Sequence, residues 1–497
     1  MRKRFESSPE LDFHPISEVL INTKTRHQLA PILVGLQYIF TTPELNEQVF
    51  EILEESIMGN KNRTGRLGMS LWEILVLGIV RLNLDIDYDF LVDQANNHDE
   101  LRGILGVRSN HVFKQKKIYK PQTIIDNVHL LEEQTIVRIN EVLVKAGHGI
   151  LKKKEKEEVL ELRIKSDSYA VESNIHFPTD INLSWDSVGK CLDTIEHIQA
   201  NECDLLSGWR KIKSTRKAIK SRYRKVSNIH SKKGKNYQQR LKGSLHPLLD
   251  WYSRIITKVE LSIEQTKKSS SIIVGVLGEQ LRTYKNYLKK FADQLKRRIL
   301  EGEKIPHEEK IFSIFEPHVE WLQKGKQNNK VELGHNVLVT TDQYHFILDY
   351  KVMVDQRDNS QPQELVERLI KRYGKGYHMK SISFDRGFYS VLTKEHLEKI
   401  FEQVVMPRKG RPTKKTKEEE ANTEYQKLKN AHSGVESNIN ELEHSGVNKV
   451  PDKGIKGFHC YVGLGVLAYN LKRLGRLVLE EEKSREGKQR KRLAKAA

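Results

Sequence analysis

One strand-forming segment, enclosed between two long helical stretches, restricts the possible folds more than any other feature of the sequence. Residues 162–175 read as a single long strand with one carboxylate, Asp167, near its middle. Helical periodicity runs before it over residues 13–147 and after it from residue 179 to about 306, and strand patterns return only from residue 311. The second helical stretch therefore interrupts a sheet, and we interpret it as an insertion.

The segments after the insertion predict the rest of the sheet. Residues 337–341 and 346–354 flank a polar turn and predict a β-hairpin, and residues 381–384 predict a strand that ends at Asp385. Helices alternate with these strands, a further strand is expected over 403–406, and Glu436 lies on the next predicted helix. This order of elements is that of a ribonuclease-H-like α/β domain.

At 497 residues the chain is longer than one hydrophobic core usually supports. We expect an all-α N-terminal domain, a catalytic domain made of two segments, a basic helical insertion and a polar, frayed tail. Their expected boundaries are 1–150 for the N-terminal domain, 160–190 with 307–480 for the catalytic domain, 191–306 for the insertion and 481–497 for the tail.

Local signals predict several helices. Ser70 and Glu73 form a capping-box pattern before an apolar run, and a second helix is expected after the polar turn near Asp85 and Asp87. This pair could read DNA, but it lacks a basic face, which favours a plain helical bundle. We expect one helix through residues 124–143, a solvated charged connection at 152–158, a helical hairpin over 248–295, a charged loop at 409–420 and a closing apolar helix at 461–479.

The net charge of +19 favours a polyanionic partner, and nucleic acid is the obvious candidate. A ribosome-associated or merely basic enzyme is the alternative. Three cysteines without C-x-x-C spacing argue against a disulfide framework and structural zinc. With no apolar run long enough to cross a bilayer, we expect no membrane contact and a cytoplasmic, nucleoid-associated protein.

The strongest concentration of charge lies inside the insertion. Residues 205–249 hold fourteen Lys or Arg and no acid, interleaved with Trp209, Tyr223 and Tyr237. A solvated helical face normally mixes signs, so we favour DNA contact, with aromatic stacking as a further possibility. The candidate DNA-binding residues are Arg210, Lys211, Lys213, Arg216, Lys217, Lys220, Arg222, Arg224 and Lys225.

Three acids on separate elements suit metal-dependent phosphoryl transfer. Phosphodiester cleavage builds charge on oxygen atoms, and two Mg²⁺ or Mn²⁺ ions held by carboxylates stabilise that charge. We expect Asp167 to bridge both ions and Asp385 and Glu436 each to complete one coordination shell. Competing assignments also exist, namely Glu172 or Asp180 for the first acid and Glu441 or Glu443 for the third.

These motifs resemble the bacterial DDE transposases of the ISNCY insertion-sequence type. The resemblance covers most of the chain and is carried by Asp167 with residues 174–180, by Asp385-Arg-Gly-Phe388, and by residues 119–128, 310–325, 432–444 and 461–470. It implies a protein that binds the terminal inverted repeats of double-stranded DNA, frees 3′ hydroxyls and joins them to target DNA without a covalent protein–DNA intermediate. Holding two DNA ends motivates the hypothesis of a homodimer on DNA.

The chain departs from the family pattern at one position. Many DDE transposases carry Arg four residues before the catalytic Glu, whereas this chain carries His432. His432 could contact a DNA phosphate when protonated, or it could orient the helix. Trp185 and Trp321 could likewise be core residues or stacking platforms for a splayed base.

Two further functions remain open. One is a DNA-binding protein derived from a transposase whose catalysis is silent, and the other is a metal-dependent nuclease that cuts without strand transfer. Intact Asp167, Asp385 and Glu436 favour an enzyme over the silent protein. A tyrosine recombinase is disfavoured, because its covalent mechanism needs an Arg/His cluster around the nucleophile.

Overall fold

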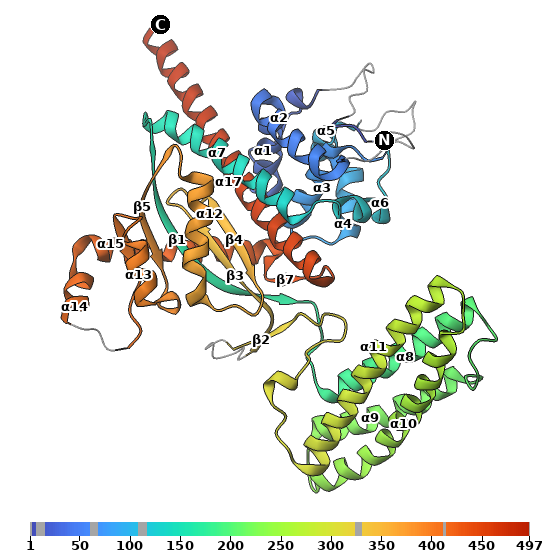
Figure 1. The fold of residues 1–497 in the computed structure, drawn as a ribbon. Helices are drawn as coiled ribbons and strands as arrows, with labels where there is room; N and C mark the ends of the chain where they lie inside the picture. Colours follow the sequence, from blue (N-terminus) through green and yellow to red (C-terminus); the bar gives the residue numbers. More distant parts are fainter. Residues whose placement is uncertain are drawn as a thin grey trace. The chain divides into compact units, whose positions relative to one another are not determined.

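The chain divides into two compact units in a computed structural model (Figure 1). Unit 1 comprises Met1–Asn174 and Leu322–Ala497, and unit 2 comprises Ile175–Trp321. The structure describes residues 2–5, 15–59, 68–107, 117–323, 331–410 and 414–496.

A mixed sheet of seven strands carries the candidate site. Its strand order is β2-β3-β1-β5-β6, with β4 paired to β3 and β7 paired to β1. β3 is antiparallel to β1 and β4, whereas β5 and β7 run parallel to β1 and β6 runs parallel to β5. The predicted long strand, the hairpin and the later strands are confirmed as β1 (Leu160–Ser173), β3 (Val331–Thr341), β4 (Ile347–Met353), β5 (Tyr377–Phe384) and β6 (Gln403–Val405); β2 (Glu320–Gln323) and β7 (Lys449–Val450) complete the sheet.

Alternate side chains of β1 enter two different cores. Leu162 and Ile164 pack with the apolar sides of α12 (Gln361–Tyr373) and α13 (Val391–Leu397). Tyr169 and Val171 belong to the other core, which also holds Val435 and Ile439 of α16 (Ser433–Leu442). Because side chains alternate along a strand, Asp167 lies on the face that α16 covers.

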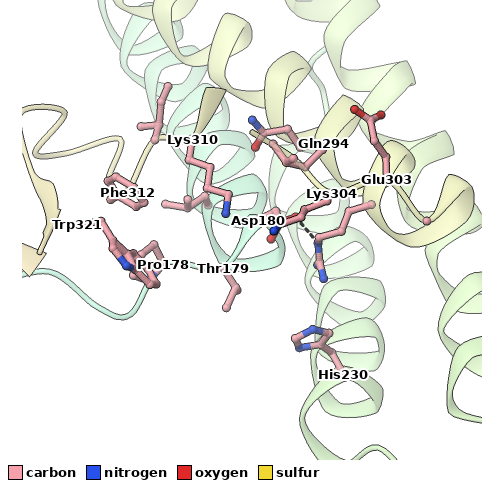
Figure 2. A pocket seen from close by; sticks show the side chains of 15 residues that line it. Pro178, Thr179, Asp180, His230, Gln294, Glu303, Lys304, Lys310, Phe312 and Trp321 are labelled. Carbon is pink, nitrogen blue, oxygen red and sulfur yellow. Dashed lines mark hydrogen bonds and ion pairs between the residues drawn. The ribbon is translucent and has the colours of Figure 1, made fainter. Parts of the chain in front are cut away.

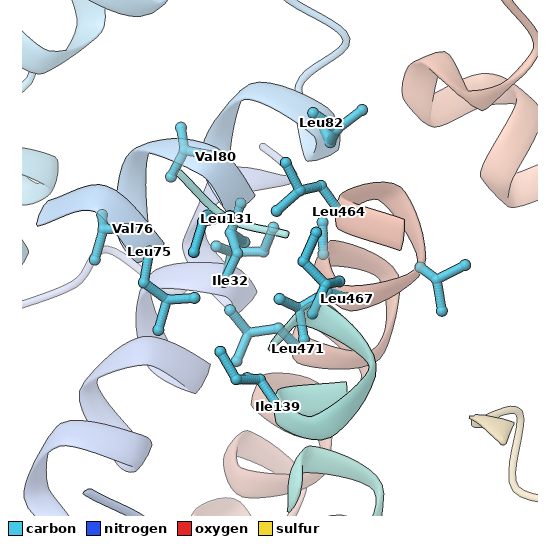
Figure 3. Close-up of a cluster of buried hydrophobic side chains, with 14 of the residues drawn as sticks. Ile32, Leu75, Val76, Val80, Leu82, Leu131, Ile139, Leu464, Leu467 and Leu471 are labelled. Carbon is cyan, nitrogen blue, oxygen red and sulfur yellow. The ribbon is translucent and has the colours of Figure 1, made fainter. Parts of the chain in front are cut away.

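The N-terminal helices do not form the separate domain expected over residues 1–150. They share one apolar core with α17 (Gly454–Ala496), from the far end of the chain, and Figure 3 shows Ile32, Leu75 and Leu131 beside Leu464 and Leu471. Burying both groups of side chains removes more apolar surface from water than either group could bury alone. The helices concerned are α1 (Leu29–Thr41), α2 (Pro43–Leu53), α3 (Leu71–Asn83), α4 (Tyr88–Asn97), α5 (Asp99–Ile104), α6 (Pro121–Val128) and α7 (Glu133–Glu155).

Local capping signals predicted the helix starts better than the helix lengths. Ser70 and Glu73 form the predicted capping box at α3, and Asp87 caps α4. The single helix expected through residues 124–143 is wrong, because a break at 129–132 separates α6 from α7. α7 then continues into the charged segment and ends at Lys156, whose backbone is left-handed (φ 60°).

Unit 2 is a helical unit larger than the insertion expected over 191–306. α8 (Asp180–Asn201) belongs to it because Val188 and Leu192 pack in the same core as α11 (Ile272–Leu295). The predicted hairpin is confirmed, since Tyr252 of α10 and Leu288 of α11 share that core. The remaining helices of unit 2 are α9 (Ile212–Lys232), α10 (Tyr237–Thr266), η3 (Lys296–Glu301) and η4 (His307–Glu309).

Two segments near the C-terminus are more helical than expected. The predicted loop at 409–420 includes α14 (Lys414–Ala421), although residues 411–413 lie outside the described part, and α15 (Thr423–Ala431) follows. The tail expected to fray after Glu480 continues α17 to Ala496. Within the described ranges, no helix combines the length and apolar character needed to span a membrane. The short helices of unit 1 are η1 (Ile16–Glu18), η2 (Glu54–Met58), η5 (Asp358–Ser360), η6 (Arg386–Phe388) and η7 (Glu443–Val447).

Candidate active site

Asp167 and Asp385 occupy matching positions on neighbouring strands. β1 and β5 pair in parallel, with Lys165 opposite Ser383 and Ser166 opposite Phe384, so the next pair in this register is Asp167 and Asp385. Asp385 directly follows β5 and keeps an extended backbone (φ −71°, ψ 164°) before η6 begins. The pairing therefore sets two carboxylates side by side at the carboxyl end of β5.

Helix α16 brings Glu436 to the same face of the sheet. His432, directly before α16, has its Nδ1 2.9 Å from the Ser383 hydroxyl, two residues before Asp385. A Cβ atom on Gly434 would lie 2.8 Å from the Nζ of Lys165, two residues before Asp167. The start of α16 thus rests on both strands, and Glu436 lies in its first turn.

The charges of these acids act on one another. Burial raises the pKa of Asp167 to about 6, the backbone N–H of Ser168 opposes this, and the charges of Asp385, Asp358 and Glu436 raise the pKa further. Among the described residues, the Asp167 carboxylate accepts a hydrogen bond from that N–H alone, at 2.7 Å. Within the described part of the chain, the exposed carboxylates of Asp385 and Glu436 have no hydrogen bond or ion pair.

Asp358 is a fourth acid at this place that sequence reasoning missed. Its carboxylate accepts a hydrogen bond from the Ser168 hydroxyl at 2.9 Å and lies close to Gly387, directly after Asp385 and Arg386. Asp358 sits in η5, in a polar stretch that reads as an ordinary turn. Only the packing of η5 against η6 brings it to the site.

Two of the competing acids are engaged elsewhere. Asp180 belongs to unit 2, where its carboxylate pairs with Arg298 at 2.6 Å. Glu441 pairs with the buried Lys472 at 2.6 Å. Glu172 lies at the far end of β1 opposite β7, and the charge of Glu443 acts on Tyr169. The register and the charge interactions both favour Asp167, Asp385 and Glu436.

His432 is held as a positioning group. Burial lowers the pKa of His432, the nearby Asp385 charge opposes this and Lys165 lowers the pKa further, so the ring is neutral at pH 7. Its Nε2 is buried and has no hydrogen-bond partner among the described residues. Of the two roles considered, these contacts favour orientation of α16 over a charged phosphate contact.

The residue types at this place suit a divalent cation. Three carboxylates lie within range of the Asp167 carboxylate, and oxygen is the donor that Mg²⁺ and Mn²⁺ prefer. As the side chains stand, however, no three His, Cys, Asp or Glu residues in the described ranges are grouped so that they could hold one metal ion. The carboxylates of Asp385 and Glu436 are exposed, so these two side chains would have to turn toward Asp167 to hold a cation together with it.

Most of the basic candidates on α9 and directly before it face solvent, but two are engaged within unit 2. Arg216 pairs with Asp193 at 2.8 Å and with Glu196 at 3.0 Å, and Arg222 lies over the ring of Trp251. The exposed members are Arg210, Lys211, Lys213, Lys217, Lys220, Arg224 and Lys225.

Two of the three aromatic residues interleaved with these cations, together with Trp185, pack inside unit 2. Trp209 is buried and donates from its indole N–H to Ser262 at 2.8 Å. Tyr223 stacks on Trp185, with ring centroids 5.2 Å apart. These three side chains are therefore core residues rather than platforms for bases.

Trp321 instead lines a cavity of about 560 Å³ in unit 2 (Figure 2). Phe312 lies beside it, with ring centroids 5.4 Å apart, and Lys304 and Lys310 extend into the same space. Arg298 also lines this cavity and keeps a buried Nη2 without a hydrogen-bond partner among the described residues. The role of Trp321 as a stacking platform stays a hypothesis that this setting permits.

Comparisons with known proteins identify no relative: no protein-family model, curated protein or solved structure matches the chain.

Proposed function

We propose that the chain is a DNA transposase of the DDE type, which uses Asp167, Asp385 and Glu436 for metal-dependent phosphodiester cleavage and strand transfer. The observation that carries the proposal is the parallel register of β1 and β5, which ends with Ser166 opposite Phe384, directly before Asp167 and Asp385, while Glu436 lies in the first turn of α16. Acids from three distant segments are thereby brought within range of one another's charge.

The sheet supports the finer fold assignment that accompanies this function. Along β4-β3-β1-β5-β6 the first three strands alternate in direction and the last three run in parallel, which is the arrangement expected of a ribonuclease-H-like domain. Helices α12 and α16 pack against opposite faces, because the two cores divide the side chains of β1. The resemblance to ISNCY-type transposases predicts this domain.

Each residue then has a separate task. Asp167, in the middle of β1, would bind both cations. Asp385, at the end of β5, and Glu436, on α16, would each complete the coordination shell of one cation. Divalent cations bound there would stabilise the charge that builds on the attacking and leaving oxygens. His432 would hold α16 on β5 through Ser383, and the exposed cations of α9 would bind DNA phosphates.

Cleavage of a labelled duplex carrying the terminal repeat, with Mg²⁺ or Mn²⁺, tests the proposal. Wild type is expected to free 3′ ends, whereas Asp167→Asn, Asp385→Asn and Glu436→Gln should bind the duplex and lose at least ~100-fold in rate. Glu395→Gln, which removes an exposed carboxylate of α13, is the matched control and should cut normally. Normal cutting by the three variants would reject these acids as the catalytic groups.

Two alternatives give different results in the same assay. A silent DNA-binding protein would bind the duplex but would not cut it with any divalent metal. A nuclease without strand transfer would cut the duplex but leave a supplied target DNA unjoined.

A further inference from the structure

We propose that a cationic pocket beside the carboxylates binds the DNA phosphate next to the one that is cut, and so sets the register of the strand. The inference rests on the proposed function for the identity of the polymer. The pocket is lined by Arg163, Lys165, Ser381, Ser383 and Lys427, together with Ile164, Gln343, Ile382, Leu428 and Ala431.

The residues of β1 and β5 that line the pocket are paired in the same register that leads to the two acids. Arg163 is opposite Ser381, Lys165 is opposite Ser383, and the next pair on the same face is Asp167 with Asp385. Two residues of a strand span about 6.6 Å, which is on the scale of one nucleotide step along a DNA strand. A strand with one phosphate at the acids would therefore bring its neighbouring phosphate over Lys165.

The cations that line the pocket are available for an anion. The ammonium groups of Lys165 and Lys427 form no ion pair or hydrogen bond with any described residue. In the described part of the chain, the one carboxylate paired with the Arg163 guanidinium is Glu161, at 3.6 Å, and Lys380 binds that carboxylate more closely, at 2.9 Å. Two ammonium groups without a described protein partner at one hollow are free to bind an anion from outside the fold.

Lys165 in particular is half-buried between the sheet and α16. A cation kept in such a place without a protein partner costs stability, unless a ligand supplies the opposite charge. The Gly434 Cα leaves room for the ammonium, since a Cβ there would lie 2.8 Å from Nζ.

The size and rigidity of the pocket suit a phosphate group. Its volume is about 270 Å³, below the roughly 300 to 1,000 Å³ of pockets that enclose a larger ligand. Gln343 fixes one rim, because it accepts from the backbone N–H of Arg163 at 2.9 Å and donates to the carbonyl of Glu161. Lys427 comes from α15, which covers the other side.

The test measures how the affinity of the full chain for a DNA duplex depends on salt, with EDTA present so that nothing is cut. Lys427→Gln should lower the slope of log affinity against log salt by about 0.9, the value for one phosphate contact. Lys429→Gln is the matched control, since Lys429 is exposed on the same helix and about 200° around its axis from Lys427. The control should leave the slope unchanged.

Lys165→Gln should lower the slope by the same amount, and the double variant by about twice as much. Unchanged slopes in both single variants, with a wild type that binds and cuts DNA, would overturn the pocket and leave the proposed function standing. A reduced slope in a protein that never cuts DNA would support the pocket as a phosphate site and reject the transposase. Circular dichroism of the exposed-site variant Lys427→Gln checks that folding is unchanged.

Discussion

Replacing Asp167 by Asn should stabilise the fold at neutral pH while it abolishes the proposed chemistry. Burial and neighbouring acids raise the pKa of Asp167 to about 6 from an ordinary 3.8. A carboxyl group whose folded pKa is raised makes the folded state more stable at low pH, and that stability is lost as pH rises from 3.8 to about 6. At about 1.4 kcal/mol per pH unit, the ionised carboxylate costs the fold about 3 kcal/mol above pH 6.

Asp167→Asn removes this cost and keeps an oxygen to accept the Ser168 N–H. We expect the variant to exceed wild type by about 3 kcal/mol at pH 7.5 but by only about 1 kcal/mol at pH 4.5. Hydrogen-exchange mass spectrometry across a urea series measures this in peptides from β1, with peptides from α10 of unit 2 as an internal control. Glu395→Gln, an exposed substitution, should change neither value by more than about 0.5 kcal/mol.

The same experiment reports on the cation. The measurement above is made with EDTA, because a divalent ion would offset the repulsion among the acids. Adding Mg²⁺ should therefore stabilise wild type more than the variant and shrink the difference at pH 7.5. An equal effect of the substitution at both pH values, or a less stable variant at pH 7.5, would show that the ionised Asp167 carboxylate does not destabilise the fold.

Three further predictions concern other parts of the chain. Gly475→Ala should destabilise unit 1 by about 1 to 3 kcal/mol in thermal unfolding, because the added Cβ would lie 1.8 Å from the backbone oxygen of Pro31. Gly487→Ala, on the same helix, places its Cβ in open space and should leave the stability unchanged. Asp452→Ala should lower the free energy of unfolding by about 3 to 5 kcal/mol in chemical denaturation, because it removes the carboxylate that lies 2.8 Å from the buried guanidinium of Arg81. A smaller loss of stability than in Glu481→Ala, which breaks an exposed ion pair, would contradict this. Lys217→Gln should lower the slope of log DNA affinity against log salt by about 0.9. Arg216→Gln should leave that slope nearly unchanged, because Arg216 is already paired with Asp193 and Glu196. Equal slopes for the two variants would count against DNA contact by α9.

Patterns of short range predicted much of the fold. The alternation in β1, the hairpin of β3 and β4, and the capping box of Ser70 and Glu73 each depend on neighbouring residues, and all are confirmed. The expected domain boundary near residue 150 was wrong because it depends on contacts between the first helices and α17, at opposite ends of the chain. No local pattern records such a contact.

The candidate site divides in the same way. Asp167 and Asp385 could be chosen from their strands, but their side-by-side placement depends on the register of β1 with β5. Asp358 and Lys165 were missed, because their importance comes from the residues that pack against them. Asp358 contacts Ser168 and lies close to Gly387. Lys165 lies against Gly434 and has no charged partner among the described residues. Arg216 was overrated because its acidic partners lie on another helix, α8.

The central claim is that Asp167, Asp385 and Glu436 act together on a divalent cation. Substituting Fe²⁺ for Mg²⁺ and adding ascorbate and peroxide generates radicals that cut the polypeptide beside the bound ion, and the fragments identify the site. We expect cuts near residues 167, 385 and 436 that excess Mg²⁺ suppresses and that Asp167→Asn abolishes. Cuts confined to other acids, such as Glu133 and Asp452 beside His459, or no specific cuts with DNA bound, would contradict it.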